Sequence, residues 1–325
     1  MRKEPKHQLQ LRNDLGFDMK IKKLCLRNGY KRFHDLTIDL GENPKRIVAL
    51  VGSNGCGKSS VLDGLLFHAN AYNQIGSGGN NSFEYHSMNR IPNFNHTNVE
   101  IHFEGGDYNT IRVERAKVGK ENTIFSFRSP HRFNSRLDVT QSNAVPELRL
   151  NNYGASYTSD LDSKMEQSYR RINIKYNSYL EKMDCRPSEA RAKIIGDLNA
   201  SIGNCLEIEI SSLGDIEASQ GTLFFRKLGQ ETEFTFNVLS SGEKEVVDIL
   251  LDLYLRKDEY SDTVFLLDEP ELHISTAIQK KLFLEIEKLL GKDCQLWVAT
   301  HSIGLLRALQ EDSRGRAVHA LRREP

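Results

Sequence analysis

The chain has 325 residues, 38% of them hydrophobic, and its 44 basic residues are balanced by 44 acidic ones. This composition supplies one large or two medium cores and excludes general disorder, while a net charge of zero excludes a global field that would draw the whole molecule onto nucleic acid. No stretch approaches the roughly 20 consecutive apolar residues of a membrane helix, and the N-terminus lacks the apolar core of a secretion signal. We therefore expect a cytoplasmic globular protein with no membrane partner.

Local patches must carry any contact with nucleic acid. Each patch is interpreted either as a solvated surface or as a weak, salt-sensitive contact with the phosphate backbone of DNA. Basic residues gather in the N-terminal segment 2–32, in a cluster of Arg128, His131, Arg132 and Arg136, and in a tail with Arg314, Arg316, Arg322 and Arg323.

The first part of the chain predicts strands around a glycine-rich loop. Residues 21–26 alternate like an edge strand, residues 36–40 form a second strand, and residues 46–51 are typical of a buried strand. The buried strand runs into Gly52–Ser59, which matches the phosphate loop G-x-x-x-x-G-K-[ST], and a helix is expected from Ser59 to about Asn70. Strand, Gly-rich loop and helix in this order are the context that a phosphate loop requires.

The segment after this helix predicts a loop followed by a sheet. Residues 71–96 are rich in Asn, Ser and Gly, which is typical of a mobile loop. Residues 98–103, 109–114 and 122–127 then alternate in the manner of strands, with a turn at 105–107, and we expect an antiparallel sheet.

Helix formers dominate the middle of the chain. Residues 157–183 and 188–203, separated by Pro187, predict a helical hairpin. Beyond it the pattern predicts three short strands and one helix, over 206–210, 222–226, 233–236 and 242–255.

Three further motifs follow in the second half of the chain. They are Leu239-Ser240-Ser241-Gly242-Glu243, Val264-Phe265-Leu266-Leu267-Asp268-Glu269-Pro270 and Ala299-Thr300-His301-Ser302. With the phosphate loop, they resemble the signature, Walker B and switch-histidine motifs of ATP-binding-cassette (ABC) ATPases, in that family's order. The resemblance implies an α/β fold, namely a P-loop NTPase of the ABC-ATPase head type, with a mixed sheet, an antiparallel β subdomain and a short helical-hairpin insertion.

The segment between Ser59 and Leu239 indicates which branch of this superfamily the chain resembles. This segment lacks the sustained heptads of the long-armed SMC proteins. With the continuation Glu271-Leu272-His273, the chain resembles RecF-type repair ATPases, OLD-family nucleases and the ATPases of Septu, retron and PARIS anti-phage systems. We expect an N-terminal lobe over 1–130, a helical insertion over 131–205 and a C-terminal lobe over 206–325, the two lobes forming one discontinuous ATPase head.

The nucleotide site is expected in the phosphate loop. Lys58 would neutralise the β- and γ-phosphates and Ser59 would give its hydroxyl to Mg²⁺, where backbone N–H groups meet phosphate at a helix N-terminus. Cys56 is interpreted as a small residue tolerated in the loop or as a thiol activated by the helix N-terminus. The residues assigned to the nucleotide are Asn54, Gly55, Cys56, Gly57, Lys58, Ser59 and Ser60.

The chemistry is assigned to the Walker B and switch motifs. Asp268 ends an apolar strand, where a carboxylate can hold the metal through water. The resemblance implies that Glu269 orients and deprotonates the attacking water and that His301 contacts the γ-phosphate. ATP and Mg²⁺ are therefore the expected cofactors.

The signature motif implies assembly. In this superfamily the hydroxyl at Ser240 contacts the γ-phosphate bound by the opposite subunit, although Ser240 with Glu243 also fits an ordinary helix N-cap. Ser241 and Glu243 replace the usual glycine and glutamine, as in the SMC-like branch, and the N–H of Gly242 assists. The resemblance implies a head-to-tail homodimer closed by two ATP molecules.

Three assignments stay open at this point. His273 belongs either to the dimer-contacting loop or to an ordinary surface loop. The stretch Tyr30-Lys31-Arg32-Phe33 resembles one that reaches the nucleotide in SMC-like heads, but it also fits packing. Gln74 and Gln141 are candidates for the glutamine that senses Mg²⁺.

These features predict an ATPase that acts as sensor or motor in prokaryotic anti-phage defence, with an effector, a nuclease or toxin, supplied in trans. The alternatives are a RecF- or SMC-like DNA-repair clamp and an ATP-gated scaffold that stores a partner. We expect no nuclease activity, because neither an HNH-like set of histidines nor an acidic metal-binding domain after His301 is evident. The five cysteines form no C-x-x-C pair, so neither disulfides nor a zinc site is predicted.

Overall fold

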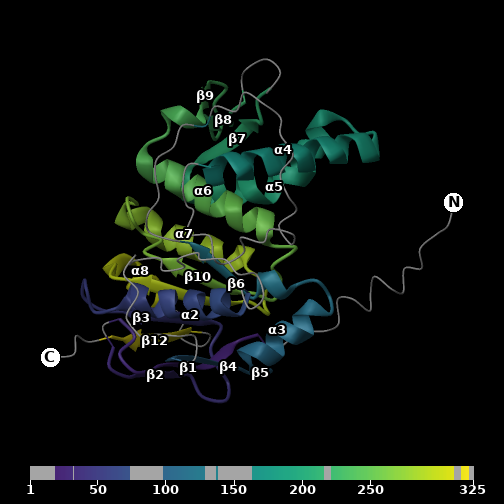
Figure 1. Cartoon of the computed structure of the whole chain (residues 1–325). Helices are drawn as coiled ribbons and strands as arrows, with labels where there is room; N and C mark the ends of the chain where they lie inside the picture. The colour runs from purple at the N-terminus through teal and green to yellow at the C-terminus, as the bar shows by residue number, and fades with distance from the viewer. Residues whose placement is uncertain are drawn as a thin grey trace.

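The computed structural model stacks sheets and helices in successive layers (Figure 1). It describes residues 19–31, 33–73, 98–128, 137, 163–215, 221–310 and 316–321. Within these ranges, no helix is long and apolar enough to cross a membrane.

The central layer is a parallel sheet with the strand order β12-β3-β11-β10-β6. Its strands are β3 (Ile47–Val51), β6 (Phe125–Arg128), β10 (Val264–Asp268), β11 (Gln295–Thr300) and β12 (Arg316–Ala320). The register aligns Thr300 with Val51 and Ala299 with Asp268. Because the strands are parallel, their carboxyl ends meet at one edge. That edge carries the phosphate loop, Asp268 and the switch-histidine motif Ala299–Ser302, here called the switch segment.

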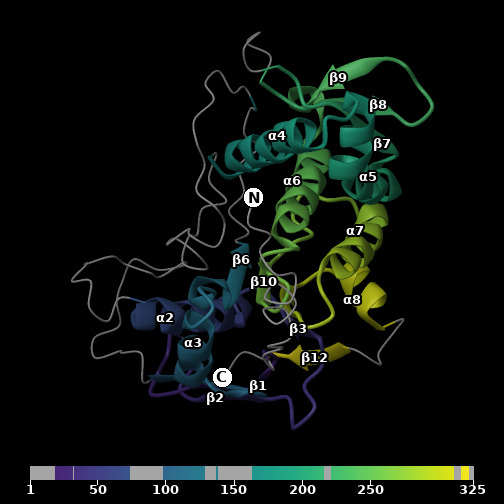
Figure 2. The ribbon, with the colours of Figure 1, turned by 90° about the vertical axis from the view of Figure 1, so that its right-hand side faces the viewer.

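Both faces of this sheet are covered, which explains why its strands are continuous apolar runs. Along β3, Val48 and Leu50 point into one core, while Ile47 and Ala49 point into the other. Trp297 and Val298 of β11 divide in the same way. Figure 2 shows α2 (Lys58–Asn73) and α3 (Tyr108–Ala116) on one side of the sheet and α7 (Thr276–Leu289) and α8 (Ile303–Gln310) on the other.

An antiparallel sheet closes the first core. Val61, Leu62 and Leu65 of α2 pack between the parallel sheet and this second sheet. Its strand order is β2-β1-β4-β5, made of β1 (Ile21–Leu26), β2 (Leu36–Asp39), β4 (Val99–Phe103) and β5 (Gly106–Asp107).

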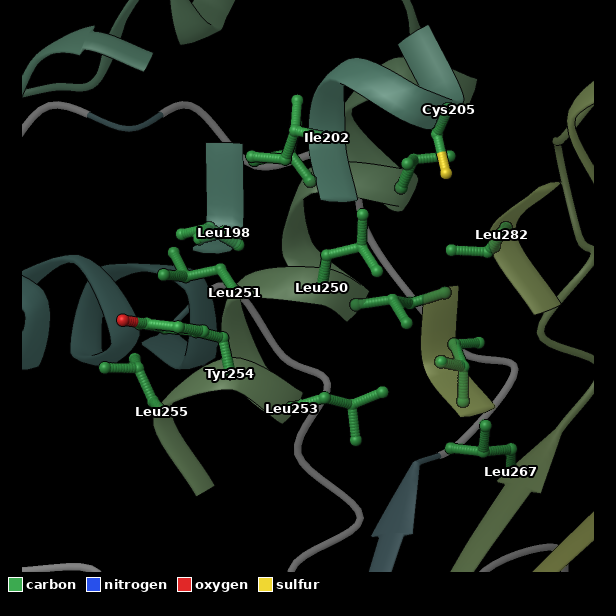
Figure 3. Close-up of a cluster of buried hydrophobic side chains, with 14 of the residues drawn as sticks. Leu198, Ile202, Cys205, Leu250, Leu251, Leu253, Tyr254, Leu255, Leu267 and Leu282 are labelled. Carbon is green, nitrogen blue, oxygen red and sulfur yellow. The ribbon is translucent and has the colours of Figure 1, made fainter. Parts of the chain in front are cut away.

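The second core extends through the helical layers. Helices α4 (Ser163–Met183) and α5 (Pro187–Leu206) form the hairpin, which packs on α6 (Ser241–Arg256). Figure 3 shows Leu198 of α5 beside Leu251 of α6, in a cluster that also holds Ile202 of α5, Leu250 of α6 and Leu282 of α7. The three-stranded sheet β7 (Ile208–Ser212), β8 (Phe224–Lys227) and β9 (Glu233–Thr235) lies beyond, and short 3₁₀ turns occupy Glu121–Thr123 and Phe236–Val238.

The prediction of a strand at 109–114 is wrong, because this segment lies in α3. Tyr108, Ile111 and Arg115 are buried at helical spacing, whereas Val113 is 48% exposed. The carboxylate of Asp107 caps the helix by accepting the Thr110 N–H at 2.8 Å, and this hydrogen bond lowers the pKa of Asp107. The strand-like alternation of Ile111 and Val113 was therefore misleading.

Two strands were placed wrongly. Residues 125–128 do not join the antiparallel sheet, because β6 runs parallel to β10 and is buried along its whole length. β1 is not an edge strand, because it pairs with β2 and β4. The structure also contains α7, α8 and β12, which the sequence analysis did not assign.

Arg128 is not part of a surface patch. Its side chain is 2% exposed and forms ion pairs with three carboxylates of α6, those of Asp248, Asp252 and Glu245. Arg128 thus joins the edge of the parallel sheet to the helix that follows the signature motif. His131, Arg132 and Arg136 lie outside the described residues, as do Arg314, Arg322 and Arg323 of the tail, while Arg316 starts β12.

Candidate functional site

The phosphate loop has the backbone of an anion-binding turn. Gly55 and Gly57 have φ angles of +78° and +101°, a region that favours glycine. A Cβ on Gly57 would also lie 2.3 Å from Cζ of Phe33. The loop therefore requires glycine at position 57 for two independent reasons, and α2 begins at the next residue.

The side chain of Lys58 is held inside this loop by hydrogen bonds to the loop backbone. Its side chain is buried, and Nζ donates to the carbonyl oxygens of Gly52 at 2.9 Å and Ser53 at 3.2 Å. Ser59 and Ser60 follow in the first turn of α2 and are partly buried. A lysine that donates to carbonyl oxygens can exchange them for phosphate oxygens, so the loop fits a nucleotide phosphate.

Cys56 is buried and packs within the loop. A Cβ on Gly52 would approach Sγ of Cys56 and the carbonyl oxygen of Leu321, each at 2.5 Å. This packing favours the interpretation of Cys56 as a small residue that fills space within the loop. Asn54 and Gly55 are exposed.

The segment around Tyr30 packs against α2 and bonds to it. The Tyr30 hydroxyl donates to Asp63 of α2 at 2.7 Å, and Lys31 forms an ion pair with the same carboxylate. Tyr30, Phe33 and Asp63 are buried. These contacts favour the packing interpretation for Tyr30 and Phe33, while Arg32 lies outside the described residues.

The Walker B strand delivers two carboxylates with different environments. Asp268 is fully buried at the end of β10. Glu269 has a φ of +47°, and its N–H donates to the carbonyl oxygen of Ala299 at 2.9 Å. Its side chain remains 24% exposed, and Oε1 lies 3.2 Å from Nδ1 of His301, which is 44% exposed. The structure therefore brings together the two residues predicted to be catalytic.

Ser240 is the N-cap of α6. Its hydroxyl accepts the N–H of Glu243 at 3.4 Å and donates to the carboxylate of Glu243 at 2.7 Å, while the Glu243 carboxylate also accepts the Ser240 N–H at 2.8 Å. Ser240 and Ser241 are exposed, so this capped terminus is open to an anion. His273, also exposed, packs its carbonyl oxygen against Gly242.

A metal site built from protein ligands alone is not evident. Among the described residues, no three His, Cys, Asp or Glu side chains are grouped to hold a metal ion. The hydroxyl of Ser59 and the carboxylate of Asp268 have the oxygen chemistry that Mg²⁺ prefers, and phosphate oxygens would complete its ligands. Gln74 and Gln141 lie outside the described residues.

Glu271 and Gln279 were not singled out from the sequence, yet both are buried polar side chains beside the switch segment. Glu271 binds Thr300 and Gln279 binds Ser302. The signal for Glu271 was its place in Asp268-Glu269-Pro270-Glu271. Gln279 lies on a helix that the sequence analysis did not assign.

The parallel sheet with a phosphate loop at its edge defines a class, the P-loop ATPase domains. Residues 47–307 match the family model described as AAA domain, putative AbiEii toxin, Type IV TA system, and the chain belongs to this family. No curated protein matches the chain.

Solved structures give matches at low sequence identity. The SMC head domain from Thermotoga maritima is 16% identical, with a TM-score of 0.45, over 93% of this chain and 94% of that one. The SmcHead bound to the C-winged helix domain of ScpA is 15% identical, with a TM-score of 0.47, over 89% and 91%. The Smc head domain bound to the C-terminal domain of ScpA derived from Pyrococcus furiosus is 15% identical, with a TM-score of 0.47, over 93% and 94%.

Proposed function

We propose that the chain binds Mg·ATP at Gly52–Ser60, hydrolyses it, and forms a head-to-tail dimer in which Ser240 of one subunit completes the site of the other. The observation that carries this proposal is the common edge of the parallel sheet, where the phosphate loop, Asp268, Glu269 and His301 meet. The meeting of these residues, which are far apart in the sequence, supports phosphoryl transfer at this edge.

The residues divide the chemistry between them. Lys58 leaves the carbonyl oxygens of Gly52 and Ser53 and binds the outer phosphates. Ser59 and Asp268 would hold Mg²⁺, which would supply positive charge at the phosphate oxygens. Glu269 takes a proton from a water molecule whose oxygen attacks the γ-phosphorus, while the bond to the bridging oxygen breaks and ADP and phosphate leave. His301, beside Glu269, donates a hydrogen bond to the γ-phosphate.

Two exposed apolar side chains support a dimer through this face. Val238 precedes the signature motif and is 71% exposed, and Ile303 follows the switch segment and is 68% exposed. Large apolar side chains next to charged functional residues are typical of a surface that another chain covers. A closed dimer would bury both, and the Ser240 hydroxyl would turn from Glu243 to the partner's γ-phosphate.

Mixing inactive variants tests the shared site. Ser240→Arg and Lys58→Ala are each expected to be inactive alone, because every site in either homodimer lacks one element. Mixed dimers contain one intact site, and an equal mixture should recover about a quarter of wild-type ATPase activity if sites act independently. A mixture of Ser240→Arg with the double variant Ser240→Arg, Lys58→Ala has no intact site and serves as the control. Absence of recovery would show that the signature does not act across an interface.

We further propose that the ATPase regulates an effector protein, a nuclease or toxin, in prokaryotic anti-phage defence. The family description, which names a putative toxin of a type IV toxin–antitoxin system, fits such a pairing. The burial of Arg128 removes one expected DNA contact and favours a protein partner over a DNA-repair clamp. Affinity capture of Glu269→Gln with ATP should enrich one protein that Lys58→Ala does not retain. ATP-dependent capture of DNA from untreated lysate, with no protein enriched once the lysate is treated with nuclease, would favour the clamp.

A further inference from the structure

The turn after Walker B and the switch segment are joined by a buried network of hydrogen bonds. Glu271, 6% exposed, accepts the Thr300 hydroxyl proton at 2.5 Å and the His301 N–H at 3.3 Å, both through Oε1. The Thr300 oxygen in turn accepts the Ser302 N–H at 3.0 Å. One threonine hydroxyl is therefore used fully, as donor to the Walker B turn and as acceptor within the switch segment.

Gln279 of α7 closes this network into a ring. Its amide oxygen accepts the Ser302 hydroxyl proton at 2.5 Å, and its amide nitrogen donates to the carbonyl oxygen of Ile274 at 2.9 Å. The N–H of Ile274 donates to the carbonyl oxygen of Glu271 at 3.0 Å, which returns the ring to its start. The ring therefore connects three parts of the chain: the turn after Walker B, the segment from Thr300 to Ser302, and α7.

Glu269 and His301 lie outside this ring but are attached to it on both sides. Glu269 precedes the ring on the Walker B turn and has a left-handed φ of +47°, which costs energy for a residue other than glycine. His301 lies between two ring members, Thr300 and Ser302. The 3.2 Å separation between Oε1 of Glu269 and Nδ1 of His301 is therefore set by backbone positions that the ring holds.

The burial of the ring makes it sensitive to single changes. Thr300 is fully buried, Gln279 is 7% exposed, and Oε2 of Glu271 has no hydrogen-bond partner in the part of the chain that the structure describes. Glu271 consequently depends on the donors at Oε1, and removing the Thr300 hydroxyl would leave a buried carboxylate with one weak donor. The turn would then shift to regain partners, and Glu269 would move with it.

We propose that Thr300, Glu271 and Gln279 are positioning residues for ATP hydrolysis, which set the geometry of Glu269 and His301 without touching the nucleotide. This inference rests on the proposed function and deepens it. It explains the Asp268-Glu269-Pro270-Glu271 continuation physically: Glu271, the second glutamate, joins the turn after Walker B to the switch segment by hydrogen bonds.

Thr300→Val tests the proposal because it keeps shape and removes the hydroxyl. We expect kcat to fall by about 10-fold or more while KM for ATP changes by less than about 2-fold, since positioning acts on the chemical step. Thr300→Ser, which restores the hydroxyl, should regain most of the lost turnover. Thr263→Val is the matched control: Thr263 is equally buried, lies immediately before β10 at the opposite edge of the parallel sheet from Thr300, and donates to the carbonyl oxygen of Thr123 at 2.6 Å. It should lower stability but not kcat.

A double-mutant cycle shows whether Thr300 acts through His301. In the His301→Ala background, Thr300→Val should lower kcat by a smaller factor than in the wild type, because one of the two groups that it positions is gone. Equal losses in both backgrounds would overturn this coupling. If Thr300→Val does not fold, Gln279→Met breaks the ring further from the site and should show the same split between kcat and KM.

The outcomes separate the inference from the proposed function. No ATP hydrolysis by the wild-type chain would overturn both. Wild-type hydrolysis together with unchanged kcat in folded Thr300→Val and Gln279→Met would overturn the positioning role alone. A rise in KM equal to the fall in kcat/KM, with kcat unchanged, would also contradict it, because it would assign these residues to binding.

Discussion

The carbonyl oxygen of His273 faces Gly242 so closely that a Cβ on Gly242 would lie 2.7 Å from it. The first turn of the signature helix therefore packs directly on the turn that follows Walker B. This contact places the two motifs of one subunit in a fixed relation, and it explains glycine at position 242 without reference to the nucleotide.

Gly242→Ala should consequently disturb both turns. Overpacking against a backbone atom typically costs about 1–3 kcal/mol, so we expect the free energy of unfolding to fall by that amount. Gly196→Ala is the contrasting change: apart from its chain neighbours and the local helix backbone, no atom of the described residues lies within 4 Å of its Cβ position in α5, and alanine should raise stability by about 0.5–1 kcal/mol. Denaturant unfolding measures both. A neutral Gly242→Ala would show that the turn at His273 yields freely.

Lys58→Ala should abolish tight binding of Mg·ATP while the fold persists. The lysine provides the mobile positive charge of the loop, and its present partners, the carbonyl oxygens of Gly52 and Ser53, remain in the variant. Isothermal titration calorimetry with circular dichroism checks binding and fold. Lys292→Ala, the same change at an exposed turn, should bind ATP as the wild type does. Wild-type affinity in Lys58→Ala would contradict the assignment of the phosphate loop.

Glu269→Gln should bind ATP but hydrolyse it at least about 10²-fold more slowly, because an amide cannot accept the proton of the attacking water. The closed dimer should then accumulate with ATP, which size-exclusion chromatography with light scattering detects. His301→Ala offers a comparison, since it removes the neighbour of Glu269 but leaves the carboxylate. Unchanged turnover in Glu269→Gln would exclude Glu269 as the base.

The stability of the chain should fall as the pH is lowered through about 6.5, in part because of His319. Burial on β12 lowers the pKa of His319 from 6.5, so the folded chain holds its imidazole neutral where the unfolded chain takes up a proton. Above that range both states are neutral and the effect vanishes; below it, protonation favours unfolding. His319→Gln should lose less stability between pH 7.5 and pH 5.5 than the wild type, measured by denaturant unfolding. An identical loss would contradict this assignment.

The sequence predicted the motifs and their order well because each is a local pattern. The strand before Gly52, the helix after it and the strand ending at Asp268 all have strong apolar runs, and the structure confirms these elements and the α/β fold. The N-cap role of Ser240 was likewise readable from its spacing to Glu243.

The rest could not be predicted because it depends on contacts between distant segments. Arg128 looked like a surface cation until Asp248 and Asp252 of α6 were found beside it. Phe125 and Phe127 fit a strand in either sheet, and only the pairing with β10 decides between them. The polar partners of Thr300 come from a turn and a helix elsewhere in the chain, so no local pattern indicates them.

The strand order of the parallel sheet has a consequence for biosynthesis. β3, which carries the phosphate loop, is made early, but both of its neighbours, β11 and β12, come from the far end of the sequence. During translation the two edges of β3 therefore stay without their native partners while β1, β2, β4 and α2 can already associate. Sheets built from such distant strands fold slowly, and their unpaired strand edges are prone to aggregation until folding is complete. We expect nascent chains to acquire ATP binding only after β12, which ends at Ala320, has left the ribosome, and to need chaperones until then.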